Sequence, residues 1–115
     1  MTPIELTKTE FIQRVGNFEE SPKDWKYVGD KPCIVDFHAP WCGYCRRITP
    51  VLDQLAKQYD DQLVVGKVNI DEQPELEERF GVEIIPTLYL FRGGEASEPI
   101  VNPGSKAQIE AWAGL

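Results

Sequence analysis

Trp41-Cys42-Gly43-Tyr44-Cys45 separates two segments of the chain that have different hydrophobic patterns. Residues 33–39 form a short apolar run that contains one acid, and such a run predicts a buried strand. Residues 46–59 carry apolar side chains at the three- and four-residue spacing of a helix. The two cysteines are therefore expected at the junction between a strand and a helix.

The two cysteines have different expected environments. Cys42 falls close to the positive end of the predicted helix, where a thiolate is stabilised. Cys45 follows about one turn later and is expected to be better shielded. Disulfide exchange needs a thiol whose pKa lies near the ambient pH. The first cysteine of a CxxC motif at a helix start has a pKa of roughly 7, whereas a free cysteine has a pKa of about 8.5. This arrangement predicts that Cys42 attacks and that Cys45 resolves.

Strands and helices are expected to alternate after the cysteine pair. Residues 63–70 form the next apolar run, and a strand–helix–strand order predicts two parallel strands with a right-handed crossover. A short helix is expected from Pro74 to Phe80, because proline favours a helix start and Gly81 favours its end. A strand at 87–92 and a weaker one near 99–101 are expected to form an antiparallel hairpin.

Both ends of the chain carry capping-box patterns. Thr7 and Glu10 predict the start of a first helix, and Ser105 and Gln108 predict the start of a last one. Residues 19–31 are polar, and their aromatic side chains are expected to attach this segment to the body of the protein. The 115 residues contain no internal repeat or linker, so residues 1–115 are expected to form one domain.

The composition excludes several classes of function. Hydrophobic residues make up 42% and charged residues 27% of the chain, as in ordinary globular proteins. No apolar run approaches the ~20 residues that cross a bilayer, so membrane insertion is not expected. A net charge of −7 argues against a nucleic-acid partner. The first residues lack the pattern of a signal peptide, which favours a cytoplasmic protein; a periplasmic chain with its leader removed is the alternative.

Four blocks of sequence together resemble the thioredoxin family over nearly the whole chain. The matching stretches are Val35-Asp36-Phe37, residues 39–45, residues 67–71, and residues 81–88 with Ile85-Pro86-Thr87. The resemblance implies an α/β thioredoxin fold, with a central mixed sheet of four to five strands and about four flanking helices. It also implies a monomeric protein-disulfide reductase that uses a Cys42–Cys45 disulfide without a cofactor. Its partners would be protein substrates with disulfides, and thioredoxin reductase or another dithiol donor.

Asp36 is an acid within the apolar strand. A buried carboxylate is costly unless it is paired or neutral, so desolvation is expected to raise its pKa. The resemblance implies that Asp36 lies beneath the disulfide and accepts the proton of Cys45, with Lys67 on the neighbouring strand as its tuning partner. A purely structural acid is the alternative.

The resemblance further implies a substrate-binding surface beside the cysteine pair. Pro86 is expected to be cis and to pack against the disulfide. The backbone of Ile85 would pair with an extended substrate segment. Trp41 is expected to be an exposed apolar platform beside Cys42, and a partly buried packing residue is the alternative.

Three residues near the cysteine pair depart from the common thioredoxin pattern, at two places in the chain. Tyr44 follows Gly43 where the family commonly has proline. This change predicts a reduction potential between the values of about −270 mV for thioredoxin and about −180 mV for protein disulfide isomerase. Asn102 and Pro103 occupy a loop where the family commonly has glycine, and their bulk is expected to narrow or reshape the surface.

His38 stands where the family usually has tryptophan or tyrosine, and it is the only histidine of the chain. Strand alternation places it on the same face as Asp36. One interpretation is a packing residue hydrogen-bonded to a nearby carboxylate, with Asp71 as the candidate. The other is that protonated His38 stabilises the Cys42 thiolate and makes it sensitive to pH.

Three other functions are weighed against reduction. Tyr44 and Pro40 favour an oxidase or isomerase of the cell envelope. Zinc binding would need Cys33 and His38 to converge with the cysteine pair, but they fall on opposite faces of one strand, so no metal site is expected. Cys33 is expected instead to be a small buried hydrophobic residue. A binding module without redox turnover is disfavoured as the sole activity because both thiols are intact.

Overall fold

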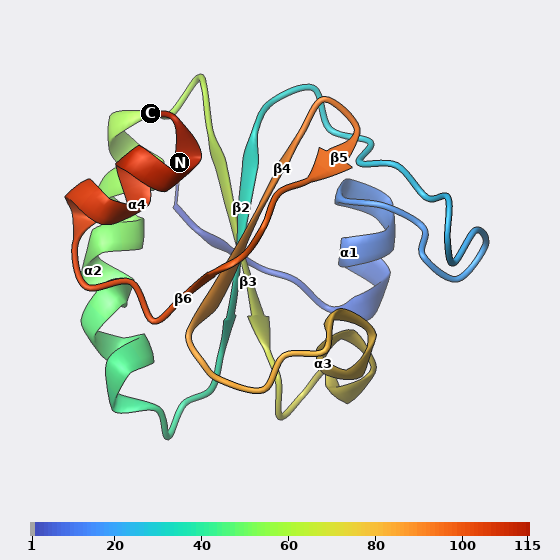
Figure 1. Ribbon diagram of the computed structural model, residues 1–115, viewed down its shortest axis with the longest axis horizontal. Coiled ribbons are helices and arrows are strands. Elements are labelled where there is room, and N and C mark those ends of the chain that lie inside the picture. The colour runs from blue at the N-terminus through green and yellow to red at the C-terminus, as the bar shows by residue number, and fades with distance from the viewer. Residues whose placement is uncertain (1) are drawn as a thin grey trace.

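The computed structural model describes residues 2–115 as a mixed β-sheet with helices on both faces (Figure 1). The helices are α1 (Lys8–Arg14), α2 (Gly43–Gln58), α3 (Pro74–Phe80) and α4 (Lys106–Ala113). The strands are β1 (Ile4–Glu5), β2 (Cys33–His38), β3 (Val64–Asn69), β4 (Thr87–Arg92), β5 (Glu95–Ala96) and β6 (Ile100–Val101). The α/β fold expected from the sequence is confirmed.

The centre of the sheet consists of β3, β2 and β4. Strands β2 and β3 are parallel and pair residue for residue, from Cys33 with Val64 to His38 with Asn69. Strand β4 runs antiparallel to β2 on its other side. The predicted β2–α2–β3 unit is therefore present, and the carboxyl end of β2 leads directly into the cysteine pair at the start of α2.

The helix ends follow the local signals of the sequence. The Thr7 hydroxyl accepts a hydrogen bond from the backbone N–H of Glu10 at 3.2 Å, as a capping box requires. The Ser105 hydroxyl accepts one from Gln108 at 3.1 Å. Helix α3 ends at Gly81, whose φ of 61° lies in the left-handed region that glycine tolerates. The predicted limits of α3 and β4 agree with the structure.

Two apolar cores hold the layers together. Helices α2 and α4 cover one face of the sheet, and α1 and α3 cover the other (Figure 1). On the first face Ile34 packs with Leu52 and Leu55 of α2 and with Ile109 of α4. The second core is rich in aromatic rings and also anchors the polar segment before β2, because Trp25 and Tyr27 contact its phenylalanines; these include Phe11 and Phe91.

The sheet has six strands within residues 2–115, more than the expected four to five. Strands β1 and β5 are additional to the expected ones, and β1 pairs in parallel with β3, placing Ile4 beside Gly66 and Glu5 beside Lys67. A strand of two residues has no periodicity that a sequence could reveal. After β4 the chain forms two short antiparallel pairings, β5 and β6, and the latter confirms the weak strand expected near residues 99–101.

Candidate active site

The two cysteines of the CxxC pair form a disulfide at the start of α2, with their Cα atoms 5.2 Å apart. Cys42 is the N-cap residue, and its Sγ accepts a hydrogen bond from the backbone N–H of Cys45 at 3.1 Å. Gly43 is the first helical residue. Cys42 keeps 6% of its surface exposed and Cys45 keeps 3%. A negative sulfur at Cys42 would thus receive both a hydrogen bond and the favourable end of the helix dipole.

Asp36 is fully buried in the centre of β2. Neither of its carboxylate oxygens has a hydrogen-bond partner among residues 2–115. Burial raises the pKa of Asp36 to about 7, the positive charge of Lys67 opposes this rise, and the negative charge of Glu5 adds to it. The expected desolvation of Asp36 is confirmed. Asp36 lies two residues after Ile34 along β2, so both side chains lie on the face of the sheet that α2 covers.

Two loops approach the disulfide from the other strands. The Ile85–Pro86 peptide bond is cis, as expected from the resemblance. The carbonyl oxygen of Ile85 lies 3.9 Å from Cys42 Sγ. The backbone N–H of Asn102 donates to the carbonyl of Pro86 at 2.8 Å, and Asn102 adopts a φ of 48°. The loop after β6 is thereby fixed beside the segment that faces the sulfur of Cys42.

Exposed apolar side chains surround the disulfide. Trp41 is 66% exposed, so it is not a partly buried packing residue, and its indole N–H donates to Asp71 at 2.9 Å. Tyr44 is 55% exposed, and the guanidinium of Arg47 lies 5.0 Å from the centre of its ring. A depression of about 200 Å³ lies between α2 and the loop after β6, with Tyr44, Arg47 and Asn102 in its wall. The site combines an apolar rim with a redox-active bond.

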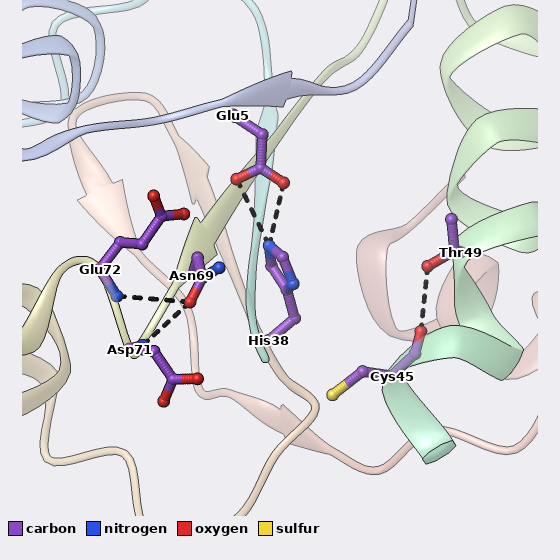
Figure 2. Close-up of polar contacts among 7 residues, drawn as sticks. All are labelled: Glu5, His38, Cys45, Thr49, Asn69, Asp71 and Glu72. Atoms are coloured by element: carbon purple, nitrogen blue, oxygen red, sulfur yellow. Dashed lines mark hydrogen bonds and ion pairs between the residues drawn. The ribbon is translucent and has the colours of Figure 1, made fainter. Parts of the chain in front are cut away.

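His38 contacts a different carboxylate from the one expected. Its Nε2 lies 3.1 Å from one oxygen of Glu5, and Figure 2 shows the ring pointing toward that side chain. Asp71 was the candidate partner, but its carboxylate accepts from Trp41, and its backbone N–H donates to Asn69. Burial lowers the pKa of His38 below its ordinary value and outweighs the opposing effect of Glu5. The ring is therefore neutral at pH 7.

Glu5 is the residue at this site that the sequence did not reveal. It precedes His38 by 33 positions and reaches it only because β1 pairs with β3. The acid between Ile4 and Leu6 is too short a pattern to predict a strand, so the sequence carried no usable signal for this contact.

The remaining cysteine lies apart from the redox pair. Cys33 is buried at the beginning of β2, and burial raises the pKa of its thiol to about 12. Within residues 2–115, no three side chains of the types His, Cys, Asp or Glu are grouped so that they could hold a metal ion. In the same part of the chain, no helix has the length and apolar character needed to cross a membrane.

The comparisons with known proteins agree with this geometry. The thioredoxin family model matches residues 4–114. Thioredoxin of Alicyclobacillus acidocaldarius is 47% identical over 83 residues, which cover 72% of this chain and 79% of that protein. Thioredoxin of Porphyra purpurea is 34% identical over 111 residues, or 96% of this chain and 94% of that protein. The chain therefore belongs to the thioredoxin family of protein dithiol–disulfide oxidoreductases.

Proposed function

We propose that the protein reduces disulfide bonds of other proteins, with Cys42 as the attacking thiol and Cys45 as the resolving thiol. Protein-disulfide reductase activity follows from the family and from the intact cysteine pair. The observation that supports the division of roles is the position of Cys42, whose sulfur is the N-cap of α2 and faces the carbonyl of Ile85. The sulfur of Cys45 lies within the first turn behind it.

The first step is the attack of the Cys42 thiolate on one sulfur of a substrate disulfide. A bond forms between Cys42 Sγ and that sulfur, and the second substrate sulfur leaves as a thiolate. The N–H of Cys45 and the start of α2 favour the charged form of Cys42, because both place positive partial charge at its sulfur. The mixed disulfide therefore forms at neutral pH without a separate base for Cys42.

In the second step Cys45 resolves the mixed disulfide. Its thiol passes a proton to the Asp36 carboxylate, its sulfur bonds to Cys42 Sγ, and the remaining substrate sulfur leaves. Two electrons have then passed from the cysteine pair to the substrate, and Asp36 carries the proton. The burial of Asp36, its lack of a hydrogen-bond partner and its pKa of about 7 support this role. Lys67, opposite Asp36 on β3, would keep part of the carboxyl population charged.

We assign substrate binding to the residues that surround Cys42. An extended substrate segment would pair with the backbone of Ile85 and lie against Pro86, with Trp41 on one side and Asn102 on the other. The exposure of Trp41 and the bond from Asn102 to Pro86 support this arrangement. Gly43, Tyr44 and His38 are assigned to tuning of the redox pair, with His38 acting through its contact with Glu5 and not by a charge beside Cys42.

The protein is proposed to work alone and without an added redox group. Residues 1–115 would act as a single monomeric domain whose only redox group is the Cys42–Cys45 disulfide, without a cofactor. Thioredoxin reductase or another dithiol donor would regenerate the reduced form. A cytoplasmic location is proposed.

Insulin reduction driven by dithiothreitol tests the proposal. The wild-type protein and Cys33→Ser should accelerate precipitation of the insulin B chain equally, because Cys33 is buried away from the pair. Cys42→Ser should abolish the acceleration, and Cys45→Ser should accumulate a mixed disulfide that mass spectrometry detects. Refolding of scrambled ribonuclease by the same samples should be slow. Fast refolding with slow insulin reduction would contradict the assignment as a reductase.

A further inference from the structure

Glu5 and His38 form a pair that ties the first strand to the strand of the active site. The two carboxylate oxygens of Glu5 lie 3.1 and 3.4 Å from His38 Nε2. The side chain of His38 is 12% exposed and that of Glu5 is 61% exposed. A neutral imidazole makes this contact by donating its Nε2–H, so the carboxylate of Glu5 keeps its negative charge. The pair as a whole carries one negative charge at pH 7.

The strand register places that charge in line with Asp36. Glu5 lies directly opposite Lys67, and Lys67 lies directly opposite Asp36. Directly paired residues share one face of a sheet, so three charged residues form a row across β1, β3 and β2. Two strand spacings separate the ends of the row, which amounts to about 10 Å between the backbones of Glu5 and Asp36. The charge of Glu5 acts on the buried carboxyl at this distance, although the exposure of Glu5 lets solvent screen part of the effect.

Among the residues that the structure describes, no other group that packs around Asp36 supplies a negative charge comparable to that of Glu5. Strand β4 contributes Leu88, which is apolar and buried. Helix α2, on the same face, begins with the cysteine pair. Glu72 acts on His38 from the segment after β3, and its side chain is exposed. Lys67 is the one cation in the row. The balance between the charged and the protonated form of Asp36 therefore depends on the opposing charges of Lys67 and Glu5.

We propose that Glu5, held in place by His38, is a positioning residue for Asp36, and that the pair favours the protonated carboxyl by opposing the positive charge of Lys67. The negative charge of Glu5 raises the pKa of Asp36, as this geometry requires. The effect matters for catalysis only if Asp36 accepts the proton of Cys45, so the inference rests on the proposed function in this respect. Glu5 would then influence the pH range in which Asp36 can accept the proton of Cys45, although β1 contributes no residue to the disulfide.

The direct test is the titration of the Asp36 carboxyl in the oxidised protein, followed by carbon-13 NMR. Glu5→Gln removes the charge and keeps the size of the side chain, so the midpoint for Asp36 should fall by about half a pH unit. Glu78→Gln is the matched control, because it removes an equal charge from an exposed site on α3. An equal midpoint in Glu5→Gln and Glu78→Gln, or a rise in Glu5→Gln, would overturn the proposal.

Two changes at His38 provide an independent test in the same experiment. His38→Phe removes the N–H donor and releases Glu5, so the midpoint for Asp36 should fall in the same direction as in Glu5→Gln. His38→Gln retains a donor and should restore most of the wild-type value. The His38→Phe change should have little further effect in the Glu5→Gln background. Full additivity of the two shifts would show that His38 does not act through Glu5.

This titration needs no substrate, so its outcome is separate from that of the proposed function. Asp36→Asn should slow the resolution of the mixed disulfide whether or not Glu5 influences Asp36. In Glu5→Gln, the pH profile of resolution should move down together with the carboxyl titration. A shifted titration with an unchanged resolution profile would support the role of Glu5 and contradict that of Asp36.

Discussion

Lys67 lies directly opposite Asp36 in the parallel register of β3 and β2, yet no hydrogen bond joins the two side chains. Asp36 is fully buried, whereas Lys67 is half-buried. The charge of Lys67 therefore offsets only part of the desolvation of Asp36, whose pKa remains raised to about 7. Ionisation of this buried acid lowers the free energy of unfolding, so the stability of the protein depends on pH.

The stability of the folded protein should depend on pH through Asp36. An unfolded chain releases the Asp36 proton near pH 4, but the folded chain releases it near pH 7. Between these values the folded state holds a proton that the unfolded state lacks, so stability falls as the pH rises. The loss from this group reaches at most about 4 kcal/mol above pH 7. Urea unfolding of the oxidised protein at pH 4.5 and pH 8 should show this fall, and Asp36→Asn should remove most of it. If the free energy of unfolding fell equally between pH 4.5 and pH 8 in the wild type and in Asp36→Asn, the result would contradict the desolvated state of Asp36.

Trp41 should contribute to binding of protein substrates. Its exposed ring is held by the hydrogen bond to Asp71, so it offers apolar area at a low entropic cost. Trp41→Ala is expected to raise KM for insulin roughly 5- to 10-fold with a smaller change in kcat. Reduction of a small aromatic disulfide serves as the control, since it does not need the platform. A matching loss with both substrates would place the effect of Trp41 on the disulfide itself.

Tyr44 should raise the reduction potential. It occupies the second position of α2, where proline is tolerated, and its exposed ring contacts only Arg47 among the aromatic and cationic contacts of residues 2–115. Tyr44→Pro is expected to lower the potential by tens of millivolts toward about −270 mV, as measured by equilibration with glutathione. Tyr44→Ala distinguishes the loss of tyrosine from the gain of proline. A wild-type potential at or below that of thioredoxin would refute the expectation.

His38 should have little direct influence on Cys42. Its ring is neutral and points toward Glu5, so it adds no positive charge beside the thiolate. His38→Trp is therefore expected to leave the alkylation midpoint of Cys42 within about 0.3 of a pH unit, the scale of weak, screened charge effects. A rise of a full unit would support the alternative in which protonated His38 stabilises the thiolate.

Local signals were sufficient for most of the fold. Pro74 and Gly81 bound α3, and Thr7 and Ser105 cap their helices as expected, because each acts through bonds to residues close in sequence. The strand–helix–strand unit followed from periodicity alone. By contrast, β1 consists of two residues whose pairing with β3 depends on the completed sheet.

At the active site, too, features set by nearby residues could be predicted, whereas contacts across the sheet could not. The helix start at Cys42 and the burial of Asp36 could be predicted from their immediate sequence. The cis bond before Pro86 came only from the resemblance, since most bonds that precede proline are trans. The contact between His38 and Glu5 could not be predicted, because β1 brings the acid to the end of β2 across the sheet.

The ionisation of Cys42 in the reduced protein tests the central claim most directly. Iodoacetamide labelling across pH 5 to 10, with mass spectrometry to locate the label, gives the reactivity of each cysteine. Cys42 should react with a midpoint near pH 7, well below the value of about 8.5 for free cysteine, and Cys33 should stay unlabelled until the protein unfolds. A Cys42 that reacts no faster than free cysteine, or that reacts only above pH 8, would contradict the account.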